Sequence, residues 1–63
     1  MSFLPQDPAM LLSYVNTKLR DRYASFREFC EEEDVEEQKI LNALQAAGYA
    51  YDAAKNAFVP ADA

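Results

Sequence analysis

The stretch ILNALQAAGYAYDAAKNAFV, residues 40–59, decides the fold because its hydrophobic period changes partway along. Before Gly48, apolar residues such as Ile40 and Leu44 recur at helical spacing, which predicts a helix over about residues 35–47. Gly48 is the only glycine in the chain, and a glycine directly after a helix is typical of the left-handed residue that ends it.

The residues after this glycine alternate with a period of two, which is typical of β-strands. Tyr49 and Tyr51 begin the alternation, and Asn56 suits the left-handed backbone of a turn. The pattern predicts a hairpin over about residues 49–59. A lone hairpin is marginally stable, so we expect it to pack on the helices through Tyr49 or Tyr51 and through Phe58.

Toward the N-terminus, the pair Asp7-Pro8 is typical of the start of a helix. The carboxylate of Asp7 can accept a capping hydrogen bond, and Pro8 suits the first helical position. One apolar stripe then predicts a helix over about residues 8–23; its members are Leu11, Leu12, Val15, Leu19 and Tyr23.

Two capping signatures divide the middle of the chain. Ser25 and Glu28 form a capping box, which predicts a short helix over about residues 26–33. Residues 34–37, with the sequence Asp-Val-Glu-Glu, repeat the signature and predict that the helix over 35–47 starts there. The element order is therefore three helices and a hairpin.

This order predicts a mainly α fold, a three-helix bundle resembling a helix-turn-helix domain, followed by a short C-terminal two-stranded β-hairpin, or wing. The chain of 63 residues has room for a single domain over residues 1–63, and residues 60–63 are expected to be a frayed tail.

Composition argues against catalysis. The chain has no His, one Cys and a formal net charge of −5. It lacks a nucleophile–base pair, a glycine-rich phosphate loop and a cluster with metal-ligand spacing, so we expect no enzyme activity, no cofactor, no metal and no small-molecule ligand. The acidic run at residues 31–37 lacks the ligand alternation and central glycine of a calcium loop, and we interpret it as solvated surface and helix-start charge.

The same composition predicts a cytoplasmic protein. A single Cys cannot form an intrachain disulfide. The N-terminal residues lack the basic and apolar regions of a signal peptide, and no apolar run approaches the length of a membrane span.

Motifs along most of the chain resemble a known family. They are Leu4-Pro5-x-Asp7-Pro8, Leu11-Leu12-Ser13, Val15-Asn16-x-Lys18-Leu19-Arg20-Asp21, Tyr23-x-Ser25, Phe29-Cys30, Asp34-Val35, Leu44, Gly48-Tyr49-x-Tyr51-Asp52 and Asn56-x-Phe58. Together they closely resemble the small bacterial proteins catalogued as domain of unknown function forty-two fifty. Phe26 and Phe29 stand where that pattern leads us to expect Leu. The family carries no assigned activity, so the resemblance implies a small bacterial cytoplasmic domain and assigns no catalytic residues.

The outer side of the first helix is the candidate interaction surface. Met10 and Tyr14 are four residues apart and predict an apolar spot away from the core stripe. The basic residues of the first half form a patch, and its members are Lys18, Arg20, Arg22 and Arg27. The alternatives are that the patch pairs with Glu28, Glu31 and Glu32 of the same chain, and that Phe3 and Leu4 fold back over the apolar spot.

Two further residues are expected to be structural. Asn16 lies beside the apolar stripe, where its amide is expected to hold a neighbouring loop or helix end; a ligand or partner contact is the alternative. Cys30 lies at helical spacing from Phe26, and without a neighbouring base we expect a buried, inert thiol.

The fold outline itself raises DNA binding. Gln38, Asn42 and Gln45 lie on the outer side of the third helix, and such amides read adenine well. The start of that helix, however, is acidic where phosphate would have to approach. We therefore expect a non-catalytic protein-interaction module whose partner is a protein or a second copy, with a divergent winged helix-turn-helix DNA-binding domain as the alternative.

Overall fold

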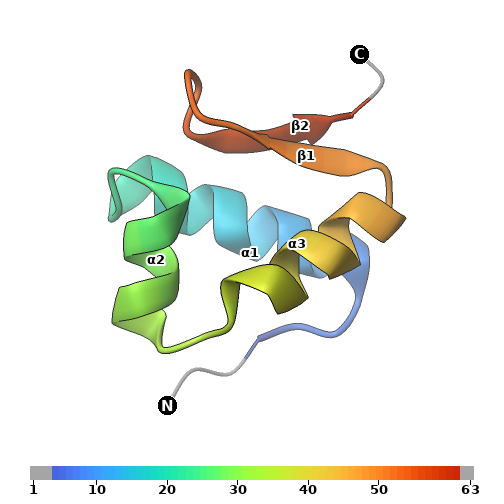
Figure 1. The fold of residues 1–63 in the computed structure, drawn as a ribbon, viewed down its shortest axis with the longest axis horizontal. Helices are drawn as coiled ribbons and strands as arrows, with labels where there is room; N and C mark the ends of the chain where they lie inside the picture. The colour runs from blue at the N-terminus through green and yellow to red at the C-terminus, as the bar shows by residue number, and fades with distance from the viewer. Residues whose placement is uncertain (1–3, 62–63) are drawn as a thin grey trace.

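The computed structural model describes residues 4–61 and confirms a mainly α fold with a C-terminal hairpin (Figure 1). The elements are α1 (Pro8–Asp21), α2 (Phe26–Glu33), α3 (Glu37–Ala46), β1 (Tyr49–Asp52) and β2 (Ala57–Pro60). The hairpin lies along one side of the three helices, with β1 packed on α3 and β2 packed on α1. Phe3 lies outside the described residues, whereas Leu4 is half-buried against the core.

Helix α1 begins where the sequence predicts but without the expected side-chain cap. Asp7 occupies the N-cap position and Pro8 the first turn, yet the Asp7 carboxylate accepts no capping hydrogen bond. The helix ends at Asp21, two residues before the predicted end. The chain turns off there because both Arg22 and Tyr23 donate their main-chain N–H groups to the Lys18 carbonyl.

The capping box of α2 is confirmed with one shift. The main-chain N–H of Glu28 donates to the Ser25 hydroxyl over 3.1 Å. The Glu28 carboxylate reaches back one residue further than expected and accepts from the N–H of Ala24 at 2.9 Å. One side chain therefore fixes the short connection between α1 and α2.

The predicted capping box at residues 34–37 is wrong, and α3 begins at Glu37. Asp34 takes a left-handed backbone with φ 57° and ends α2, and the N–H of Val35 donates to the Cys30 carbonyl. A short acidic side chain suits a left-handed helix end as well as a helix start, so its sequence signature is ambiguous. The N-cap of α3 is Glu36, whose side chain makes no capping bond.

The core is a single cluster with Phe29 at its centre, fully buried and in edge or stacked contact with Tyr14, Tyr23 and Phe26. The hairpin joins this cluster through the rings of Tyr51 and Phe58, as predicted. The buried members are Leu11, Val15, Leu19, Phe26, Phe29, Cys30, Ile40, Leu44 and Phe58.

The hairpin pairs Tyr49 with Pro60 and Tyr51 with Phe58 in antiparallel register. Gly48 has a φ of +95° and Asn56 a φ of 51°, so both residues take the positive φ that the sequence predicts. Pro60 belongs to β2, and the N–H of Ala61 donates to the Gly48 carbonyl at 2.8 Å. The predicted frayed tail is therefore ordered through Ala61, and residues 62–63 lie outside the described part.

A candidate interaction surface between helix α1 and the hairpin

The side chain of Asn16 joins α1 to the outer edge of β2. Its amide nitrogen donates to the Phe58 carbonyl at 3.1 Å, and its amide oxygen accepts from the Phe58 N–H at 2.8 Å. A primary amide carries the same donor and acceptor as a peptide group, so Asn16 stands in for the missing neighbouring strand. The structural prediction for Asn16 is confirmed, although its partner is a strand edge and not a helix end.

Asn56 joins the hairpin turn to the end of α1. Its amide nitrogen donates to the carbonyl of Leu19, in the last turn of α1, and to that of Tyr23, just beyond the end of the helix. Its amide oxygen accepts from the Tyr51 hydroxyl at 2.7 Å, and that hydroxyl accepts from the Phe26 N–H. This partly buried network of hydrogen bonds holds the turn against α1.

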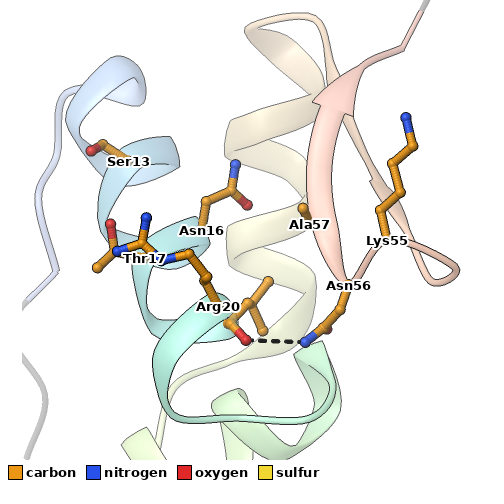
Figure 2. Close-up of a pocket in the computed structure, with 8 residues that line it drawn as sticks. Ser13, Asn16, Thr17, Arg20, Lys55, Asn56 and Ala57 are labelled. Carbon is orange, nitrogen blue, oxygen red and sulfur yellow. Dashed lines mark hydrogen bonds between the residues drawn. The ribbon is translucent and has the colours of Figure 1, made fainter.

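Between these two asparagines lies a pocket of about 550 Å³. Figure 2 shows one wall from α1 and the other from the turn and the start of β2, with the Asn56–Leu19 hydrogen bond at its end. None of the residues lining it is acidic; they are Ser13, Asn16, Thr17, Leu19, Arg20, Lys55, Asn56 and Ala57. Two cationic residues separated by 35 positions, Arg20 and Lys55, therefore line the same pocket in a chain of net charge −5, although Figure 2 shows their side chains extending in different directions.

An exposed stripe on α1 continues from this pocket toward the start of the helix. Met10, Ser13, Thr17 and Arg20 follow one another at spacings of three, four and three, which places them on one side of the helix. All four are exposed, and Met10, at 61% exposure, is the one large hydrophobic residue exposed among residues 4–61. The exposed surface therefore runs from the apolar side chain of Met10, near the start of α1, to the pocket that Arg20 and Lys55 line.

Tyr14 does not belong to this stripe, and the expected apolar spot of Met10 with Tyr14 is wrong. The Tyr14 ring is half-buried and meets Phe29 edge to face with 6.3 Å between ring centroids. Its hydroxyl donates to one carboxylate oxygen of Glu33 at 3.2 Å, and the Tyr23 hydroxyl donates to the other at 2.6 Å. Helix α2 packs on that side of α1 and converts a predicted surface residue into an interhelical contact.

This shared carboxylate raises the pKa of both tyrosines. For Tyr14 burial is the main cause, followed by the charge and hydrogen bond of Glu33. For Tyr23 the main cause is its hydrogen bond to Glu33, which stabilises the protonated hydroxyl.

The predicted basic patch is divided among several environments. The Lys18 ammonium lies 5.4 Å from the centroid of the Tyr14 ring, a cation–π contact. Arg20 forms two hydrogen bonds with its neighbour Asp21, and Arg22 is exposed at the end of α1. Arg27 pairs with Glu31 at 3.6 Å, as the intrachain alternative predicts for that residue. Because the Arg20–Asp21 pair is solvent-exposed, it leaves Arg20 able to exchange partners at little cost.

Cys30 is buried, as predicted, and desolvation raises the pKa of its thiol to about 11. It is one of the residues that line another, smaller hollow of about 390 Å³. Glu31, Glu36 and Glu37 line that hollow together with Arg27, so it repels anionic ligands and keeps the thiol protonated.

The outer side of α3 is polar, as the DNA-binding alternative requires, but its helix start is acidic. Gln38 donates its side-chain amide to Asn42 at 3.0 Å, so these two side chains satisfy each other. Glu36 and Glu37 at the start of α3 are exposed. Phosphate would meet negative charge at this end of the helix.

Sequence patterns identify neither Lys55 nor Asn56 as lining the pocket, and they do not show the role of Glu33 in the contact between α1 and α2. The acidic run at residues 31–37 is predicted to be solvated, but its member Glu33 accepts hydrogen bonds from the hydroxyls of Tyr14 and Tyr23. The hydrogen bonds of Glu33 to the two tyrosines and of Asn56 to α1 and its end join residues ten or more positions apart, so no local pattern signals them.

Residues 4–61 contain neither a metal-binding cluster nor a membrane-spanning helix. No three His, Cys, Asp or Glu side chains lie together in a way that holds a metal ion. No helix in this part of the chain has the length and apolar character needed to cross a membrane.

A family model described as Domain of unknown function (DUF4250) matches residues 5–58, which is most of the chain. No curated protein and no solved structure matches.

Proposed function

The chain belongs to the DUF4250 family, and we propose that it is a non-catalytic protein-interaction module that binds an acidic segment of a partner protein in the pocket between α1 and the hairpin. The observation that carries this proposal is that Arg20 and Lys55 both line a pocket that no carboxylate lines, on a protein of net charge −5. Placing the chain's scarce cations in one concave site favours an anionic partner.

The chemistry of the stripe suggests how a partner segment lies. Carboxylates of the segment would accept from Arg20 and Lys55, and the hydroxyls of Ser13 and Thr17 would donate to its main-chain carbonyls. An apolar side chain of the segment would cover Met10 at the other end. The segment therefore carries acidic residues followed by an apolar one, in extended form.

Hydrogen bonds between α1 and the hairpin hold the walls of the pocket together. Asn16 and Asn56 hold β2 and the turn against α1 through main-chain carbonyls and an N–H group, so the fold sets the spacing of the main-chain segments that carry Arg20 and Lys55. Binding to such a preformed site costs little conformational entropy on the side of the module.

The absence of catalysis is part of the proposal. The chain has no His, and the only thiol is buried with a raised pKa, so the residues offer no activated nucleophile. The lone cysteine and the family resemblance support a cytoplasmic location in bacteria.

The experiment is an NMR titration of the ¹⁵N-labelled protein with three probes: a peptide of alternating Glu and Leu, a peptide of the same length with Gln in place of Glu, and a mixed-sequence DNA duplex. The acidic peptide is expected to shift the amide signals of Ser13, Thr17, Arg20 and Ala57. The double variant Arg20→Gln with Lys55→Gln should lose this response, while Lys39→Gln on α3 should keep it.

Two results would overturn the proposal. Equal shifts with the Glu and Gln peptides would show that charge does not direct binding. Stronger binding to the duplex, with shifts on α3 and a steep loss in salt, would favour the DNA-binding alternative.

A further inference from the structure

The outer edge of β2 is closed to any further strand. Its outward-facing main-chain groups at Phe58 are both bonded to the Asn16 amide. Two residues further along, Pro60 has no N–H to offer. Side-chain capping and proline are two ways in which proteins prevent strand addition at an edge.

The outer edge of β1 has no such protection. Because both main-chain groups of Phe58 face outward, its cross-strand partner Tyr51 is at a non-hydrogen-bonded position and also faces outward. The bond from Ala61 to Gly48 places Tyr49 at the next outward position. Among residues 4–61, the N–H and C=O groups of Tyr49 and Tyr51 have no hydrogen-bond partner outside the hairpin.

We propose that this edge binds the same edge of a second copy of the chain, so that two hairpins form one four-stranded antiparallel sheet. With the two-fold axis at Ala50, Tyr49 of each copy faces Tyr51 of the other, and all four outward groups of each strand are paired. A register centred on Tyr49 or on Tyr51 leaves groups of the other tyrosine unpaired. The edge is thus complementary to itself in one register.

Charge and stability favour this occupant. In that register Asp52 faces Gly48 of the second copy, so the two Asp52 carboxylates lie about 14 Å apart along the sheet, beyond the screening length at physiological salt. A two-stranded hairpin is marginally stable by itself, and additional strands stabilise it. The binding pocket lies on the other side of the hairpin, beside β2, so this inference does not depend on the proposed function.

The test uses charge reversal at the two-fold axis. Ala50 alternates with Tyr51, whose side chain points into the core network, so Ala50 lies on the outer face and accepts a long side chain. Ala50→Lys or Ala50→Glu places two like charges opposite each other in the dimer, while an equal mixture of the two variants places opposite charges there. Ala54→Lys in the exposed turn controls for added charge.

Sedimentation equilibrium from about 10 μM to about 1 mM measures the outcome. The wild-type protein and the Ala54→Lys variant are expected to dimerise. Each Ala50 variant alone should have a dissociation constant raised at least about tenfold, and the mixture should restore dimers. A wild-type monomer at every concentration, or a mixture no more associated than the single variants, would overturn the proposal. Circular dichroism of each variant confirms that loss of association is not loss of fold.

Discussion

Asn16 on helix α1 and Phe58 on strand β2, 42 positions apart, exchange two hydrogen bonds between a side-chain amide and the main chain of a strand. The helix thereby closes one edge of the hairpin and fixes the register of β2 on the core. Two consequences follow: β2 is held against α1 as a wall of the pocket, and β1 is left as the outer edge of the hairpin without such a side-chain cap.

Replacement of Asn16 is expected to destabilise the fold strongly. Asn16→Ala leaves the half-buried N–H and C=O of Phe58 without partners, and the free energy of unfolding should fall by about 2–3 kcal/mol. Urea denaturation measures this change. Thr17→Ala, at the next residue on the exposed stripe, should change it by no more than about 0.5 kcal/mol. Equal effects of the two substitutions would show that the amide pair contributes nothing specific.

Gly48 is expected to resist replacement for reasons of backbone alone. A Cβ at this residue would meet no atom within 4 Å, but its φ of +95° is strained for an L-residue. Gly48→Ala should lower the free energy of unfolding by about 1 kcal/mol. A synthetic protein with D-alanine at this position should be as stable as the wild type or more so, because a D-residue favours positive φ. If the L- and D-alanine proteins unfold at the same urea concentration, backbone strain is not the cause.

Alkaline pH is expected to destabilise the α1–α2 contact. The folded protein holds the hydroxyl protons of Tyr14 and Tyr23 to a higher pH than the unfolded chain, whose tyrosines titrate near 10. Stability from this source is complete below about pH 10 and falls as the pH rises through the folded pKa values. Urea denaturation at about pH 9 and about pH 11 measures the fall, and the double variant Tyr14→Phe with Tyr23→Phe should reduce it. An unchanged fall in that variant would place the alkaline transition elsewhere.

Cys30 is expected to react only through unfolding. With a pKa of about 11 its thiol is almost entirely protonated near neutral pH, and its side chain is buried. Labelling with an aromatic disulfide reagent should be slow in buffer and should accelerate in urea along the unfolding curve. Stoichiometric labelling within seconds in buffer would contradict this.

The comparison of sequence with structure separates local from non-local information. The Ser25–Glu28 capping box, the positive φ of Gly48 and the alternation at Tyr49 and Tyr51 are set by neighbours in the chain, and all were predictable. The sequence pattern places Asp34 at the start of α3, whereas the structure places it at the end of α2. Aspartate suits both a helix start and a left-handed helix end, so the pattern alone does not distinguish them.

The candidate site was less predictable because tertiary packing builds it. A helical period shows that Tyr14 lies off the main stripe, but only the placement of α2 brings Phe29 and Glu33 against it. Likewise, nothing near Lys55 in the sequence indicates that the turn lies beside Arg20. The basic patch predicted from the sequence therefore includes Arg20 but lacks Lys55, the other cationic residue that lines the pocket.

The central claim, that the pocket between α1 and the hairpin receives an acidic partner segment, is tested most directly by site-specific photocrosslinking in cells of the native host. A photoreactive phenylalanine analogue replaces Thr17 at the pocket or, as a control, Gln38 on α3. The account predicts discrete protein adducts from position 17, with the crosslinked peptide rich in Asp and Glu, and their loss in the Arg20→Gln, Lys55→Gln background. Adducts of the same pattern from both positions, or DNA adducts from position 38, would contradict it.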